Sequence, residues 1–160
     1  MNKQAERATK SDTATRILEV AERLAQTQGF NGFSYADIAA ELKITKASLH
    51  YHFATKADLG CALIVSYIKS FEAALAKIDL VASQSALGKY LQLYEDVLVR
   101  DRMCLCGMLA AEYSTLPPPM QHEIRRFFDR NEAWLTSSME RGRASGGLHF
   151  EGSVIEAVDV

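Results

Sequence analysis

The sequence has few cysteines and no long uninterrupted apolar run, and each shortage excludes a class of protein. Three cysteines are an odd number, and no signal-peptide pattern opens the chain, so we expect a reducing, cytoplasmic environment rather than a disulfide scaffold. Apolar runs such as 57–65 are broken by charge or fall far short of the roughly 20 residues that span a bilayer, so we expect no membrane role. Cys104 and Cys106 lack the further ligands that a zinc site needs, and no metal or cofactor is expected.

The net charge of −2 provides no global field that would draw the chain to nucleic acid, so a DNA-binding surface must come from local arrangement. Residues 42–57 contain no Asp or Glu, and acids resume at Asp58. The basic side chains of this stretch are Lys43, Lys46, His50, His52 and Lys56. Because His50 and His52 are two residues apart, they do not share a helix face and are poor joint metal ligands.

Apolar residues recur at helical spacing along the whole chain, and neither strand-like alternation nor an internal repeat occurs, so the predicted fold class is all-α. Residues 1–10 are polar and are expected to fray. The helical pattern is established from Ile17, and Gly29 stands where the first helix should stop.

Three N-cap patterns follow. Ser34 with Asp37 predicts the start of a second helix of about two turns, and Thr55 with Asp58 predicts a long fourth helix that runs to about residue 77. Between them, Thr45 is a plausible N-cap for a short third helix ending near residue 53. The order of helix, short helix, turn and short helix predicts a helix-turn-helix DNA-binding domain over residues 1–55.

Residues 56–160 are expected to form a helical domain for ligand binding and dimerisation. Helices are predicted over 84–100, over 106–116 and over 120–145, with the run Pro117-Pro118-Pro119 ending the second of these. Ser153 and Glu156 form a further capping box, although the sequence stops four residues later. We therefore expect that the natural protein continues with at least one more C-terminal helix.

The third helix has the composition of a helix that enters the major groove. At about 100° per residue, Leu49 and Phe53 face inward, and the outer face carries small or polar side chains and one aromatic: Ala47, Ser48, His50 and Tyr51. Small residues allow close approach, and hydroxyl and imidazole groups can meet base edges. Lys46 can reach a guanine edge or a phosphate.

Anion-binding positions are expected at three helix starts. Thr45-x-x-Ser48 has no acid that would neutralise the positive end of the third helix. Lys56, with the first amides of the fourth helix, offers a second phosphate clamp, and Ser34 with Tyr35 at the start of the second helix offers a third.

The stretch GFNGFSYADIAAELKITKASLHYHFATKADL resembles the DNA-binding segment of the TetR family of bacterial repressors, with Tyr51-His52-Phe53-Ala54-Thr55-Lys56 as the most specific part. The resemblance covers about residues 15–63. It implies base or backbone contacts from Lys46, Ala47, Ser48 and His50, and phosphate contacts from Tyr35, Tyr51, His52 and Lys56. At His50 the family most often has an aromatic residue. The resemblance also implies a homodimer, a palindromic operator, a ligand pocket in the body and repression that the ligand relieves.

Apolar and aromatic side chains of the body are candidates for that pocket, although each could instead be core or dimer interface. The candidate ligand-binding residues are Tyr94, Met103, Cys106, Met108, Tyr113, Phe127 and Trp134. Cys104 and Cys106 have two interpretations: both thiols are buried packing, or Cys106 is a sensor of electrophiles whose thiolate is favoured at a helix N-terminus. The apolar surroundings favour the first interpretation.

Two rival classes of function remain. An enzyme would need a catalytic motif, but the sequence has no nucleophile elbow, phosphate-cradling glycine loop or paired metal-binding histidines, so no catalytic residue is predicted. A helical interaction module without DNA binding is the other rival, and a salt-dependent gel shift would separate it from a DNA-binding regulator. The preferred hypothesis is a sequence-specific repressor that a small molecule releases.

Overall fold

The computed structural model of the protein describes residues 3–78 and 83–158, and these residues contain eight α-helices, one 3-10 turn and no strand. The predicted all-α class is confirmed. In chain order the elements are α1 (Lys3–Gln28), α2 (Tyr35–Leu42), α3 (Lys46–His52), α4 (Lys56–Ile78), α5 (Ser83–Leu98), α6 (Leu105–Ala111), η1 (Tyr113–Thr115), α7 (Pro118–Ala144) and α8 (Val154–Val158).

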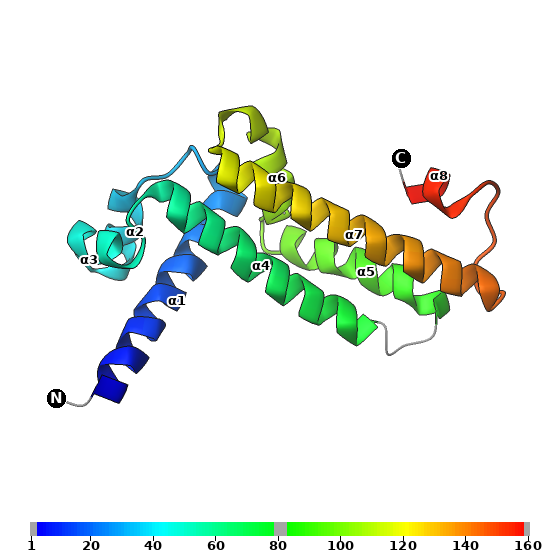
Figure 1. Cartoon of the computed structure of the whole chain (residues 1–160), viewed down its shortest axis with the longest axis horizontal. Coiled ribbons are helices and arrows are strands. Elements are labelled where there is room, and N and C mark those ends of the chain that lie inside the picture. The colour runs from blue at the N-terminus through cyan, green and yellow to red at the C-terminus, as the bar shows by residue number, and fades with distance from the viewer. Residues whose placement is uncertain (1–2, 79–82, 159–160) are drawn as a thin grey trace.

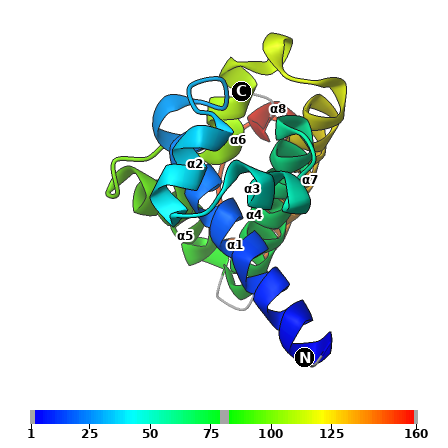
Figure 2. The ribbon, with the colours of Figure 1, turned by 90° about the vertical axis from the view of Figure 1, so that its left-hand side faces the viewer.

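The helices form a head and a body (Figure 1). The head is made of α1, α2 and α3, and the body is built on α4, α5 and α7, which pack on one another. Viewed from the head end, α2 and α3 lie together in front of the body helices (Figure 2). Helix α6 contacts both α1 and α7, so a short body helix lies against the head.

The head helices begin at the predicted caps. Ser34 accepts a hydrogen bond from the Ala36 amide at 3.2 Å, and its own amide donates to Asp37 Oδ2 at 2.7 Å. Thr45 Oγ1 accepts from the Ser48 amide at 3.1 Å. Between α2 and α3, Lys43 takes the left-handed conformation with φ 55°, so the chain turns sharply after Leu42 and α3 starts at Lys46.

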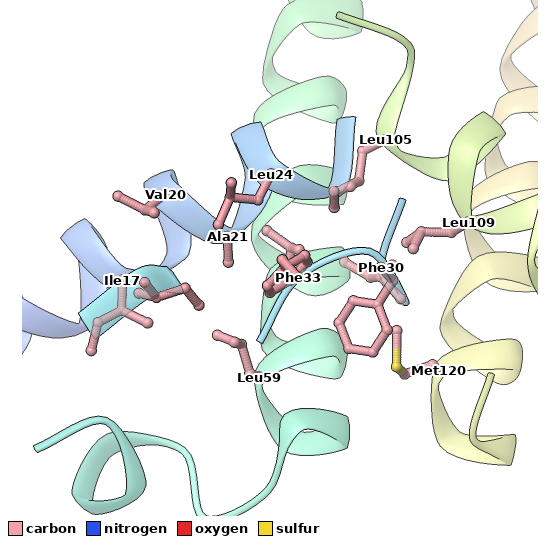
Figure 3. Close-up of a cluster of buried hydrophobic side chains, with 14 of the residues drawn as sticks. Ile17, Val20, Ala21, Leu24, Phe30, Phe33, Leu59, Leu105, Leu109 and Met120 are labelled. Atoms are coloured by element: carbon pink, nitrogen blue, oxygen red, sulfur yellow. The ribbon is translucent and has the colours of Figure 1, made fainter. Parts of the chain in front are cut away.

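One hydrophobic core joins the head to the body. Leu49 of α3 is fully buried, and it belongs to the same core as Ile17 of α1, Leu59 of α4 and Met120 of α7. Figure 3 shows side chains from α1, the loop after it and the body helices meeting in this core. The core crosses residue 55, so the head and the body share their packing, and a division of the chain there remains a prediction.

Three segments differ from the sequence-based prediction. The polar residues from Lys3 onward continue α1 instead of fraying before it. The helix predicted over 106–116 ends at Ala111 and is followed by η1. Pro118 and Pro119 lie in the first turn of α7, where a missing N–H costs no intrahelical hydrogen bond. The proline run therefore starts a helix as well as ending the segment before it.

Helix α4 has the length and apolar composition of a membrane span, with a mean hydropathy of 1.5 over 18 residues. It also packs against α1, α5, α6 and α7. The core helix of a globular protein can meet the same criteria, so this composition is weak evidence for a membrane segment.

The crossing of α4 and α7 depends on Gly60. A Cβ there would collide with the buried Met120 side chain and would lie 2.9 Å from Phe30 Cζ. We expect Gly60→Ala to lower the free energy of unfolding by about 1–3 kcal/mol, as overpacking of a filled core does. Gly88→Ala is the matched control, because a Cβ at Gly88 on α5 has no neighbour within 4 Å; it should stabilise by up to about 1 kcal/mol. Urea unfolding of both variants measures the difference, and equal effects would contradict the assigned contact.

Candidate nucleic-acid interface and body cavity

Helix α3 has one buried face and one exposed face. Leu49 is 0% exposed and Phe53 packs half-buried against the core, which fixes the rotation of the helix. On the opposite side Tyr51 is 69% exposed. We call the exposed residues Lys46, Ala47, His50 and Tyr51 the reading face. The predicted contact residues Ser48 and His52 are half-buried at its edges.

The N-terminal end of α3 carries no acid in its first turn. Thr45 Oγ1 satisfies the Ser48 amide, so the hydroxyl of Thr45 serves as a helix cap. Since Lys46 is exposed beside this end, the local charge is positive, and an anion such as a phosphate is favoured there.

The start of α2 differs, because its cap includes an acid. The Ser34 hydroxyl and amide both donate to Asp37 Oδ2, at 2.8 and 2.7 Å, and these bonds lower the pKa of the Asp37 carboxyl. A carboxylate at a helix N-terminus occupies the position that a phosphate would take. The phosphate contact predicted for Ser34 is therefore less favourable than one at α3.

Tyr35 contacts the protein itself. Its ring is buried, and its hydroxyl lies 2.9 Å from the Phe53 carbonyl and 2.7 Å from the Thr55 carbonyl, both acceptors. Burial, and next the charge of Asp58, raises the pKa of Tyr35 to about 12. The hydroxyl that was predicted to contact phosphate thus ties α2 to the turn between α3 and α4.

His50 has one ring nitrogen engaged within the head. Nδ1 lies 2.9 Å from the Ala54 carbonyl oxygen, and the ring packs on Tyr35 with centroids 4.8 Å apart. A carbonyl can only accept, so Nδ1 carries the hydrogen. In the neutral ring Nε2 is then the acceptor, and a base amino group is the complementary partner.

Lys56 has an intramolecular partner that the sequence did not reveal. Its Nζ donates to the Phe30 carbonyl at 2.5 Å and to the Phe33 carbonyl, and it lies 4.6 and 4.3 Å from the centroids of these two rings. Burial lowers the pKa of Lys56, while the charge of Glu112 opposes that shift. The ammonium thus binds the loop between α1 and α2, and a phosphate contact by this side chain remains a prediction without structural support.

A cavity of about 290 Å³ lies between α4 and α7. Its walls share the spacing i, i+3, i+4 and i+7 on each helix. The lining residues in these positions are Ile68, Phe71, Glu72 and Leu75 of α4, with Phe127, Arg130, Asn131 and Trp134 of α7. Of the seven candidate ligand residues, Phe127 and Trp134 are in this set. The sequence-based prediction missed the other lining residues. The spacing i, i+3, i+4 and i+7, which occurs in both α4 and α7, is the sequence signal that could have identified them.

Polar groups lie at two places in this apolar lining. Glu72 and Arg130 form an ion pair. Asn131 is 9% exposed, and its Nδ2 donates to the hydroxyls of Tyr90 and Tyr94 at 2.8 and 3.1 Å. Tyr94 therefore contacts a lining residue without lining the cavity itself. Burial raises the pKa of its hydroxyl.

The other four candidate ligand residues do not line this cavity. Met103 is 51% exposed, and Met108 is half-buried. Tyr113 lies beside Arg125, whose guanidinium donates to its hydroxyl. Cys106 is fully buried in the main core.

The cysteine sensor hypothesis is not supported at Cys106. Burial is the main cause that raises the pKa of this thiol, whereas a sensor needs an accessible thiolate. Cys104 is half-buried at the start of α6, and the Tyr67 hydroxyl donates to its Sγ at 3.6 Å. Among the described residues no group of three or more His, Cys, Asp or Glu side chains is placed to hold a metal ion.

The short helices α2 and α3, with α3 exposed on one face and attached to a helical body, define a helix-turn-helix DNA-binding protein. Residues 17–62 match the model of a family described as bacterial regulatory proteins, tetR family. No curated protein matches the chain.

Solved structures extend the similarity over nearly the whole chain. A TetR-family transcriptional regulator from Agrobacterium tumefaciens is 33% identical with a TM-score of 0.89, and the match covers 94% of this chain and 81% of that one. A TetR transcriptional regulator from Legionella pneumophila is 32% identical with a TM-score of 0.77, covering 90% and 77%. AibR, solved with isovaleryl coenzyme A and operator DNA, has the same fold at 22% identity and a TM-score of 0.73, covering 91% and 80%.

The chain therefore belongs to the TetR family of bacterial transcriptional regulators. This is a family of DNA-binding regulators, not of enzymes.

Lys46 in α3 and Lys56 at the start of α4 allow a matched test of the geometry. Lys56→Met removes the donor to two carbonyls and should lower the free energy of unfolding by about 1–3 kcal/mol. Lys46→Met acts on an exposed side chain and should change it by less than about 0.5 kcal/mol. Chemical denaturation without DNA gives both values. If Lys56→Met were as harmless as Lys46→Met, the internal role of Lys56 would be wrong.

Proposed function

We propose that this regulator is a repressor that binds a palindromic operator as a homodimer and releases it when a small, largely apolar molecule occupies the cavity between α4 and α7. The main support for the proposed DNA binding is the reading face of α3. It combines exposed small and polar side chains with an N-terminal end that has a lysine and no acid. Since DNA is its target, the protein would act in the cytoplasm.

Only a few side chains of α3 would contact base edges directly. Ala47 leaves room for close approach, and Lys46 and His50 Nε2 offer a donor and an acceptor to base edges. Tyr51, exposed at the outer side of α3, can reach the phosphate backbone. Because one short helix reads few bases, specificity requires two copies of α3 in successive major grooves, about 34–36 Å apart.

The effector half is supported by the position of the cavity. Helix α4 begins at Lys56 in contact with the head and lines the cavity from Ile68 to Leu75. A molecule that separates α4 from α7 would shift the helix that meets the DNA-binding head. The apolar lining favours an apolar ligand body, and Glu72 with Arg130 offers charged groups at the same site. AibR, of similar fold, was solved with both a small molecule and operator DNA.

DNA binding is tested by selecting duplexes from a random library with the wild-type protein. We expect an enriched palindrome, and we expect Lys46→Ala either to change the preferred bases or to lower the slope of log affinity against log salt by about 0.9 per protomer. Lys89→Ala, an exposed lysine on α5, is the control and should do neither. Enrichment of no duplex, or a Lys46→Ala variant indistinguishable from Lys89→Ala, would contradict the assigned interface.

Effector binding can be followed through Trp134, the only tryptophan of the chain and a lining residue of the cavity. We expect small aromatic or branched aliphatic compounds that change Trp134 emission to weaken operator binding about 5- to 150-fold, and the operator to weaken their binding by the same factor. Ala133→Phe narrows the cavity at a lining position and should abolish the emission change. Compounds that bind Ala133→Phe and wild type equally would place the effector elsewhere.

A further inference from the structure

Glu112 connects the body to the head by directional hydrogen bonds. It lies at the junction of α6 and η1. Its Oε2 accepts from the Phe30 amide at 2.6 Å and its Oε1 accepts from the Asn31 amide at 3.2 Å. Each oxygen of one carboxylate thus binds one of two consecutive amides in the loop that joins α1 to α2, residues 29–34.

The same loop is held from a second direction by the start of α4. Lys56 Nζ donates to the carbonyls of Phe30 and Phe33, and both rings are buried in the main core (Figure 3). The Glu112 carboxylate therefore accepts hydrogen bonds from amides of the loop, and the Lys56 ammonium donates hydrogen bonds to its carbonyls. Charged groups make such bonds about twice as strong as neutral ones.

Two further features fit the loop to Glu112. The Asn31 Nδ2 donates to Thr115 Oγ1 of η1 at 2.8 Å, beside the carboxylate contact. Gly29 has φ +81°, and a Cβ there would lie 2.8 Å from Glu112 Oε1. The left-handed backbone at position 29 and the close approach of the carboxylate both favour a residue without a side chain there.

We propose that Glu112 is a positioning residue for DNA binding, whose carboxylate fixes the angle at which the body presents α3. The inference rests on the proposed function. Apolar contacts alone are non-directional and permit small rotations, whereas two hydrogen bonds to consecutive amides define an orientation. Because α6 holds the loop through Glu112 and α4 holds it through Lys56, a displacement of α4 relative to α6 strains one of these two attachments, and the head must turn or detach.

The test compares Glu112→Ala and the isosteric Glu112→Gln with Glu132→Ala, a control at an exposed glutamate of α7. Amide hydrogen exchange comes first. In Glu112→Ala the Phe30 and Asn31 amides should exchange faster while core amides of α7 keep their protection. Glu112→Gln, with one acceptor oxygen left, should fall between wild type and alanine, and Glu132→Ala should match the wild type.

The second readout is the tolerance of half-site spacing, which a residue that only stabilises the fold would not alter. The duplex selected by the wild type is compared with derivatives that have one base pair inserted or removed at the centre, which rotates one half-site by about 34–36°. We expect the wild type to discriminate strongly, and Glu112→Ala to reduce the affinity ratio by about fivefold or more.

Unchanged amide exchange, or faster exchange with an unchanged spacing ratio, would overturn the positioning role of Glu112 while leaving the proposed function intact. If the wild type enriches no duplex, the proposed function itself fails and the positioning role fails with it. A lower spacing ratio in Glu112→Ala, with Glu132→Ala unchanged, supports both.

Discussion

The short loop between α1 and α2 must satisfy its main-chain polar groups in the interface between head and body, and this requirement shapes both sides of that interface. Buried or half-buried amides and carbonyls need partners. The structure supplies Glu112 for two amides and Lys56 for two carbonyls. The rings of Phe30 and Phe33 fill the core beneath them. The DNA-binding head is consequently attached to two body helices by polar groups whose geometry is fixed.

The capping of the helices separates α3 from α2, α4 and α8. Helices α2, α4 and α8 each begin with a Ser or Thr paired to an acid, at Asp37, Asp58 and Glu156. Helix α3 begins with Thr45 and has no acid in its first turn. The amides at the start of α2, α4 and α8 are thus partly neutralised within the chain, whereas the positive end of α3 faces outward with Lys46 beside it.

The body has a tightly packed region and a region where packing leaves a cavity. Around α6 and the start of α7 the side chains are fully buried, as Leu105 and Met120 are. Farther along α4 and α7 the packing leaves the cavity that Trp134 lines. Beside it, the buried Asn131 donates hydrogen bonds from its side-chain nitrogen to the hydroxyls of Tyr90 and Tyr94. Pockets for small molecules are concave and mostly apolar, and this cavity lies away from the tight junction with the head.

The sequence by itself determined the helical class and the starts of α2, α3, α4 and α8. Each of these follows from residues a few positions apart, such as Ser34 with Asp37, whose interaction needs no tertiary context. The tertiary structure decided which of the predicted contact side chains are engaged within the protein, as Tyr35 and Lys56 are. Lys56 and the loop carbonyl of Phe30 are 26 residues apart, and Phe30 and Glu112 are 82 apart. No local pattern encodes such a pairing, because it exists only once packing has brought separate helices to the same loop.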